Sequence, residues 1–95
     1  MSKITKSAKG QQCQIRIPGV CNGNRETVVA AHLNGYGMGC KNPDLFISYA
    51  CSACHDEVDA RTWCQTFKRS DISRMFYEGI FRTQTILLRD GLIKI

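Results

Sequence analysis

Four of the six cysteines occupy positions from which their sulfurs could share one metal ion. Cys51 and Cys54 are separated by two residues where a helix is expected to begin, so one ion can take both thiolates from that turn. Cys13 and Cys21 flank a turn at Pro18-Gly19, with a spacing less regular than that of most zinc knuckles. Two sulfurs from a hairpin and two from a helix start suit tetrahedral Zn²⁺ in a treble-clef arrangement, so we expect a structural zinc there.

Disulfides are the weaker interpretation of these cysteines, because the sequence shows no secretory signal and the cytosol is reducing. Cys40 and Cys64 are predicted to be buried apolar thiols, and the same interpretation stays open for some of the other four. The turn at residues 20–23 resembles a zinc knuckle, in which Gly23 lets amide groups approach the sulfur of Cys21. A structural zinc would contribute about 10–16 kcal/mol of apparent folding free energy, which would offset the small core of so short a chain.

Both histidines of the chain lie close in sequence to this expected scaffold. His55 directly follows the second cysteine pair, and Asp59 lies four residues later, so the two side chains share one helix face and can offer two ligands to a divalent ion. A neutral His32 is suited to activate water near pH 7, while a divalent ion polarises a phosphate. The alternatives are structural histidines and a solvated aspartate. Two neighbouring acids are expected to be solvated: Asp56 and Glu57.

Three segments that precede the second cysteine pair have strand-like patterns. Residues 12–17 alternate in polarity, residues 27–33 are β-branched and apolar at their start, and residues 45–50 are largely apolar and aromatic. Three glycines within residues 34–39 require a loop. We therefore predict that the second and third segments form a β-hairpin with a long, Gly-rich connection, which places His32 at the end of the first hairpin strand.

Two helices are expected to follow the hairpin. The first has Ser52 as its N-cap and ends at residues 61–63, and the second begins near residues 70–71 and stops at Gly91. Gly79, inside the second helix, costs about 1 kcal/mol relative to alanine, which indicates close packing at that point. One face of this helix is apolar and is predicted to be core: Ile72, Met75, Phe76, Ile80, Thr83 and Leu87.

Length, composition and charge limit the classes of function. Ninety-five residues predict one α+β domain over 1–95, in which the basic residues 1–10 form a flexible arm or a short helical lead-in. The net charge of +5 favours a polyanionic partner such as DNA. No apolar run approaches the length of a membrane span, so we expect a cytoplasmic protein without membrane contact.

One set of motifs runs from the end of the first hairpin strand to the following helix: Ala31-His32, Gly37-Met-Gly-Cys-Lys41-Asn-Pro-Asp44 and Cys51-Ser-Ala-Cys54-His55. It resembles the zinc-bearing branch of the HNH endonucleases. The chain is similar to small phage and prophage proteins of the YbcO-like family, described as nuclease candidates, over nearly all of its length, including residues 13–23 and the last helix. A likeness to the RecA-dependent phage nuclease Ref covers only about residues 31–59.

The resemblance implies a ββα-metal (HNH-like) fold with a structural zinc and a metal-dependent phosphodiester hydrolase activity. His32 matches the water-activating base of HNH enzymes, and His55 matches the metal-ligand histidine that follows the second cysteine. Asp59 stands where many members carry the last histidine. The resemblance therefore implies that His55 and Asp59 bind a catalytic divalent ion such as Mg²⁺, Mn²⁺ or Ni²⁺.

The sequence departs from the HNH pattern at two positions. The middle asparagine of the motif usually sits five residues before the first cysteine of the pair, where this chain has Phe46. Asp44 lies two residues earlier, on the same strand face, so we assign it the role of orienting His32, with Asn42 as the weaker candidate. Many HNH proteins place a metal ligand immediately before the base, where this chain has Ala31. Water or another residue then fills that coordination position, or activity is lost.

Three functions remain open on the sequence alone. The first is a phage or prophage DNA endonuclease, active in recombination or DNA processing, in which Arg25, Lys41 and Arg61 steer phosphates; the resemblance implies 5′-phosphate and 3′-hydroxyl products. The second is a non-catalytic zinc module that binds nucleic acid or a phage or host recombination protein. The third is an adaptor with structural histidines. Apolar residues beside the core stripe of the last helix suit either a homodimer interface or a wide buried face in a monomer: Tyr77, Phe81 and Leu88.

Overall fold

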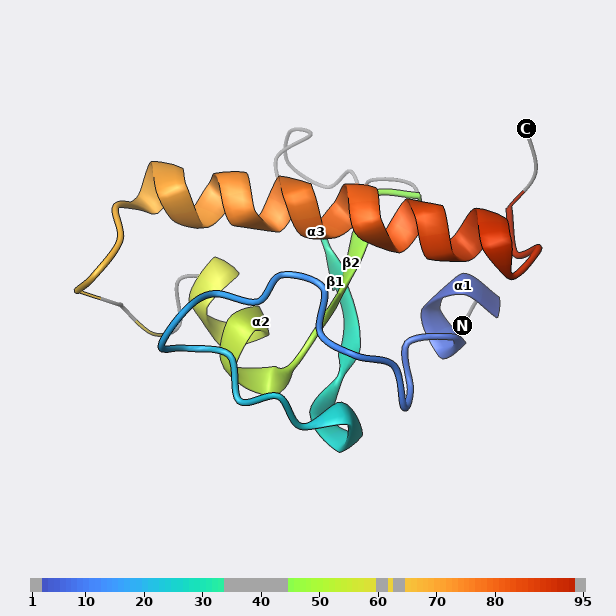
Figure 1. The fold of residues 1–95 in the computed structure, drawn as a ribbon, viewed down its shortest axis with the longest axis horizontal. Helices are drawn as coiled ribbons and strands as arrows, with labels where there is room; N and C mark the ends of the chain where they lie inside the picture. Colours follow the sequence, from blue (N-terminus) through green and yellow to red (C-terminus); the bar gives the residue numbers. More distant parts are fainter. Residues whose placement is uncertain (1–2, 34–44, 60–61, 63–64, 94–95) are drawn as a thin grey trace.

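The computed structural model describes residues 3–33, 45–59, 62 and 65–93 of the chain. Its elements follow the order α1 (Lys3–Lys6), the 3₁₀ turn η1 (Arg25–Thr27), β1 (Val29–His32), β2 (Ile47–Ala50), α2 (Ser52–Val58) and α3 (Arg69–Arg89). The long helix α3 lies across the two strands, and α2 lies beside them (Figure 1). Two strands and their covering helices confirm the predicted α+β class, including the C-terminal helix.

Strands β1 and β2 form the antiparallel hairpin that the sequence predicts. His32 pairs with Ile47 at the loop end of the hairpin, where the amide of Leu33 continues the pairing to the carbonyl of Phe46 at 2.9 Å. Both strands are shorter than predicted, and the first starts later because residues 25–27 turn into η1. All four residues of β2 are buried, so this strand forms the centre of the core.

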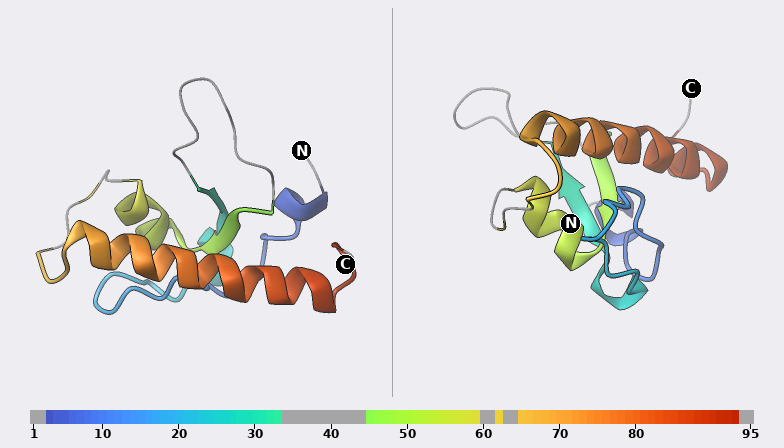
Figure 2. Two further views of the ribbon diagram at one scale, coloured as in Figure 1. Left: turned by 90° about the horizontal axis from the view of Figure 1, so that it is seen from above. Right: turned by 60° about the vertical axis from the view of Figure 1, so that its left-hand side comes forward.

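Helix α3 packs its apolar stripe against β2 (Figures 1 and 2). Thr83 makes the central polar contact, because its hydroxyl accepts the amide of Tyr49 at 3.0 Å and donates to the carbonyl of Gly79 at 2.8 Å. The predicted core face is confirmed, with Met75 half-buried and these residues buried: Ile72, Phe76, Ile80, Thr83 and Leu87. The side chains beside that stripe are exposed: Tyr77, Phe81 and Leu88.

Local hydrogen bonds determine where the helices begin and end. The N-cap of α2 is Cys51, whose sulfur accepts the amide of Cys54 at 3.4 Å, so the predicted cap at Ser52 is wrong by one residue. Helix α2 ends at Val58, earlier than predicted, whereas α3 begins within two residues of the predicted start. Gly91, with a φ of +75°, terminates α3 as expected. No helix in the described part of the chain combines the length and the apolar character needed to cross a bilayer.

Residues 12–17 do not form the predicted strand. The chain bends there, and Arg16 adopts a φ of +57°, which interrupts the alternation of an extended chain. The segment still runs beside the sheet, because the amide of Gln14 donates to the carbonyl of Tyr49 at 2.8 Å. The alternating polarity therefore does not correspond to an extended backbone, and the polar Gln14 is itself buried.

Residues 3–8 form a packed helical lead-in. Helix α1 is followed by Ser7, whose Oγ lies 2.7 Å from the hydroxyl of the fully buried Tyr49. Ala8 is also buried in the core. Of the two alternatives for this basic segment, the described residues favour the lead-in over the flexible arm.

A buried ion pair joins α2 to the start of α3. Glu57 is only 1% exposed, and its Oε2 lies 2.7 Å from Nη1 of Arg69. The other guanidinium nitrogen donates to the carbonyl of Glu57 at 2.7 Å, and the hydroxyl of Thr62 donates to Oε1 at 2.8 Å. The expectation of a solvated Glu57 is therefore wrong. A carboxylate can be buried here because hydrogen bonds and an opposite charge replace its water.

We predict that Gly79→Ala lowers the free energy of unfolding by about 1 kcal/mol, although alanine is the better helix former. A Cβ at this position would lie 2.6 Å from Oγ of Ser48 and 3.2 Å from the carbonyl oxygen of Gln14. Urea denaturation at saturating zinc measures the change. The double variant Gly79→Ala/Ser48→Ala should recover part of the loss, because it removes the closest atom. A Gly79→Ala protein as stable as the wild type would contradict this packing.

Candidate functional site

The four cysteines predicted to share a metal ion lie together in the structure. The sulfurs of Cys13, Cys21, Cys51 and Cys54 are all within 4.8 Å of one another, and those of Cys21 and Cys51 are 3.8 Å apart. Tetrahedral zinc with bonds of about 2.3 Å separates its sulfurs by about 3.8 Å. Three of the four residues are buried, and Cys21 is half-buried. This group could hold one metal ion, and an all-sulfur donor set is compatible with zinc.

Two distant segments bring the sulfurs together. Cys13 and Cys21 flank a turn in the N-terminal segment, where the amide of Cys21 donates to the carbonyl of Ile17 at 2.9 Å and Gly19 has a φ of +77°. Cys51 and Cys54 come from the first turn of α2. A side-chain bridge joins the two segments, since Nδ2 of Asn22 donates to Oγ of Ser52 at 3.1 Å.

Backbone amides of the N-terminal segment donate to sulfurs of both cysteine pairs. Cys13 accepts the amides of Ile15 and Arg16, and Cys54 accepts the amide of Ile17. Such donors stabilise negative sulfur, as metal-bound thiolates require. The positive φ of Arg16 therefore has a local cause, because it turns this residue's amide towards Cys13.

The predicted zinc knuckle at residues 20–23 also directs a backbone amide at a sulfur. Cys21 accepts the amide of Gly23, which has a φ of +67°. Its glycine makes this turn predictable from the sequence. The corresponding turn after Cys13 is not predictable in the same way, because arginine stands where a residue with positive φ is needed.

Contacts among the sulfurs shift the pKa values of the thiols in opposite directions. A hydrogen bond with Cys54 holds the pKa of Cys13 well below its usual value, and backbone amides act in the same direction against burial. The same contact, together with burial, raises the pKa of Cys54, while burial raises the pKa of Cys21. A divalent cation fits this position because its charge stabilises neighbouring thiolates.

His55 and Asp59 lie on one face of α2, as their spacing predicts. Nε2 of His55 is 3.2 Å from Oδ2 of Asp59, and the two side chains are 28% and 19% exposed. Both therefore remain within reach of solvent in the helix that supplies Cys51 and Cys54. An imidazole and a carboxylate held together in this way are suitable ligands for a divalent ion.

His32 ends β1 and is half-buried, and Ala31 before it is fully buried. Because side chains alternate along a strand, the two residues point to opposite faces of the hairpin. A ligand side chain in place of Ala31 would enter the core. Within the described residues, His32, His55 and Asp59 do not form a ligand group as compact as that of the four cysteines.

The described residues include one of the three positively charged candidates, Arg25. Arg25 lies in η1, before the start of β1, whereas His32 lies at the other end of that strand. Lys41 and Arg61 lie outside the described residues, as do the predicted orienting residue Asp44 and the residues Asn42, Cys40 and Cys64.

Comparisons with known proteins relate the whole chain to one family. The family model described as "Putative nuclease YbcO" matches residues 2–92. The chain is 48% identical over 97 residues to the "Putative nuclease YbcO" of Escherichia coli (strain K12), with 99% of each chain covered. The figures are the same for the "Putative nuclease ybcO" of Enterobacteria phage 82. These matches confirm the YbcO-like resemblance, while the HNH and Ref likenesses stay predictions.

A solved structure is also similar to the chain. It is described as a "putative bacteriophage protein from Escherichia coli str. K-12 substr. MG1655", and it matches with a TM-score of 0.80 and 49% identity. The match covers 93% of this chain and 99% of that one. The arrangement of elements described above is therefore shared over the full length of this relative.

We predict that the purified protein carries one zinc ion per chain and that Cys51→Ser loses it. Loss of a thiolate removes a ligand and the N-cap of α2, so the variant should unfold at a much lower urea concentration than the wild type. Elemental analysis and urea denaturation measure the two effects. Cys40→Ser is the matched control, because we predict no ligand role for Cys40. A Cys51→Ser protein that retains the metal would contradict the site.

Proposed function

Because the chain belongs to the family described as "Putative nuclease YbcO", we propose that it is a metal-dependent endonuclease of the HNH (ββα-metal) type. Its substrate would be the phosphodiester backbone of DNA, and its setting phage or prophage recombination or DNA processing. The observation that carries the HNH assignment is the His55–Asp59 pair in α2, directly after the cysteine pair, with His32 at the end of the hairpin.

The order of the described elements supports this type. Two antiparallel strands are followed directly by α2, which gives the strand–strand–helix order of a ββα-metal fold. Helix α2 contacts both strands, and the sulfur cluster at its first turn attaches it to the N-terminal segment. The proposed zinc is therefore structural, since all four of its ligands come from the protein and leave no position open for substrate.

The proposed chemistry divides between two places. His32 takes a proton from the attacking water, and Asp44 orients its ring. His55 and Asp59 hold the divalent ion, Mg²⁺, Mn²⁺ or Ni²⁺, which when bound polarises the phosphate and stabilises the leaving oxygen. Since Ala31 supplies no ligand, water and the substrate itself would fill the remaining coordination positions.

A non-catalytic zinc module that binds nucleic acid or a recombination protein is the second candidate. Two observations favour it. Ala31 is fully buried at the position where many HNH proteins carry a metal ligand. In addition, Nε2 of His55 is engaged by Asp59 at 3.2 Å, an ion pair that a helix can use for stability alone. This candidate predicts salt-dependent DNA binding without cleavage.

We predict that His32→Ala lowers the rate of plasmid nicking by at least about 10²-fold in the presence of Mg²⁺, Mn²⁺ or Ni²⁺, because a general base contributes about 10²–10⁴-fold. Zinc content should stay unchanged. Asp59→Asn should also lose activity, whereas Glu78→Gln, which removes an exposed helix carboxylate elsewhere, is the matched control.

Two outcomes would count against the proposed enzyme. Nicking by His32→Ala at the wild-type rate would show that His32 is not the base. A zinc-loaded wild-type protein that binds DNA but nicks it with none of the three ions would favour the non-catalytic module.

A further inference from the structure

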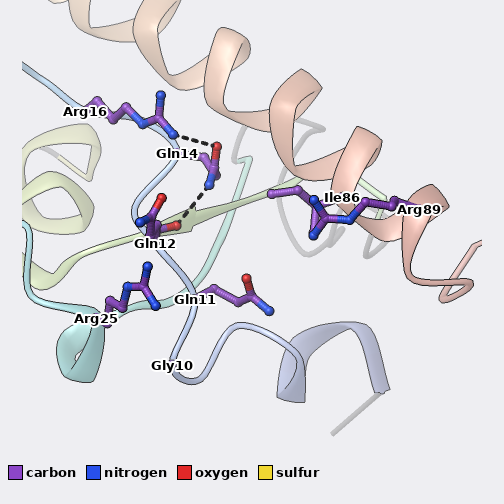
Figure 3. A pocket seen from close by; sticks show the side chains of 8 residues that line it. All are labelled: Gly10, Gln11, Gln12, Gln14, Arg16, Arg25, Ile86 and Arg89. Atoms are coloured by element: carbon purple, nitrogen blue, oxygen red, sulfur yellow. Dashed lines mark hydrogen bonds between the residues drawn. The ribbon is translucent and has the colours of Figure 1, made fainter.

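Three arginines from separate parts of the chain surround one hollow of about 390 Å³. Arg16 comes from the N-terminal segment, Arg25 from η1 and Arg89 from the last turn of α3 (Figure 3). Six of the eight lining residues are arginine or glutamine, so the hollow presents mainly hydrogen-bond donors and amide groups. The remaining lining residues are Gly10 and Ile86, and the glutamines are Gln11, Gln12 and Gln14.

Little negative charge compensates the three guanidinium groups. None of the described residues that line it is acidic. Within the described part of the chain, Arg16 bonds to neutral acceptors, the carbonyl of Cys13 at 3.1 Å and the side-chain amide of Gln14 at 3.5 Å. The side chain of Arg25 has no hydrogen-bond or ion-pair partner among the described residues, and Arg89 has an exposed contact with Asp90 at 3.2 Å. Because opposite charges attract, an anion in the hollow would be stabilised by all three guanidinium groups.

The backbone of Arg16 gives independent support for a role of its side chain. It is the one described non-glycine residue with a positive φ, +57°, a left-handed conformation that is unfavourable for a residue with a Cβ. Glycine would donate the same amide to Cys13 without that cost, as Gly23 does for Cys21. The chain instead carries an arginine, whose Nε is anchored to a carbonyl and whose other nitrogens are held at the hollow.

The chemistry of the lining fits a phosphate group. Guanidinium forks match two oxygens of a phosphate, and side-chain amides add further donors. None of the four clustered cysteines, His32, His55 or Asp59 lines the hollow. Arg25 lies before the start of β1, at the opposite end of that strand from His32, and the amide of Gln14 donates to the carbonyl of Tyr49 in β2. A phosphate in the hollow would therefore contact residues other than those proposed for hydrolysis.

We propose that this arginine hollow (Arg16, Arg25 and Arg89) binds an internal phosphodiester of the nucleic acid strand, away from the hydrolytic centre. The inference rests on the proposed function in one respect, the identity of the ligand as nucleic acid. It does not require that the chain cleaves that ligand.

DNA binding by the zinc-loaded protein, measured by fluorescence anisotropy without Mg²⁺, Mn²⁺ or Ni²⁺, tests the proposal. Arg16→Gly removes the guanidinium and relieves the backbone, so this variant should fold at least as well as the wild type. Arg16→Gly/Arg89→Gln should weaken binding more than about tenfold, and the slope of log Kd against log salt should fall by about 0.9 for each lost contact with duplex. Arg74→Gln, which removes another exposed arginine of α3, is the matched control for Arg89→Gln and should leave the slope unchanged.

The outcomes separate this proposal from the nuclease assignment. If Arg89→Gln and Arg74→Gln change the salt slope equally, the hollow is not a phosphate site. A loss of affinity seen only with 5′-phosphorylated DNA would assign a terminal phosphate instead and overturn the internal site. A protein that shows the predicted slopes but never nicks DNA supports the hollow and contradicts the nuclease. A protein that nicks while the arginine variants bind like wild type contradicts the hollow alone.

Discussion

The sulfur cluster of Cys13, Cys21, Cys51 and Cys54 is the constraint on which the rest of the structure depends. It joins an N-terminal segment without regular structure to the first turn of α2. The amides of residues 15–17 donate to the sulfurs, so the segment makes these hydrogen bonds instead of pairing as a strand. Its remaining pairing, Gln14 to Tyr49, keeps it against β2. The core and the candidate active site are both built around this junction.

Periodicity and spacing predicted the parts of the fold that depend on local pattern. The hairpin and the buried stripe of α3 follow from residue types at a fixed interval, whereas the end of α3 near Gly91 and the close approach at Gly79 follow from single glycines. The failures share a different cause. Residues 12–17 alternate like a strand, but the sulfurs impose another backbone. The acid Glu57 belongs to a short helix, but Arg69, twelve residues away, makes its burial possible. Contacts between distant segments decided both.

The residues of the candidate site likewise divide into those that local spacing predicts and those that only distant contacts bring together. The pairing of His55 with Asp59 was predictable, because a helix places residues four apart on one face. The cysteine set was predictable from two short spacings. In contrast, no local pattern joins Arg16, Arg25 and Arg89, which approach one another only when α3 lies across the sheet. The sequence predicts that Arg25 steers phosphates together with Lys41 and Arg61, and the structure places Arg25 before the start of β1, at the opposite end of that strand from His32. Long-range packing brings these charges together, and no spacing or periodicity in the sequence indicates that packing.

Cys51 has two structural roles that one atom performs, and their combination has a consequence in the cell. Its sulfur caps α2 and belongs to the cluster that could hold a metal ion, so the helix and the cluster form together. With seven residues, α2 is too short to persist by itself in water. If the proposed zinc binds there, a newly made chain without it would expose the hairpin and the apolar face of α3 to proteases. The abundance of the mature protein would then follow the supply of zinc and not only the rate of synthesis.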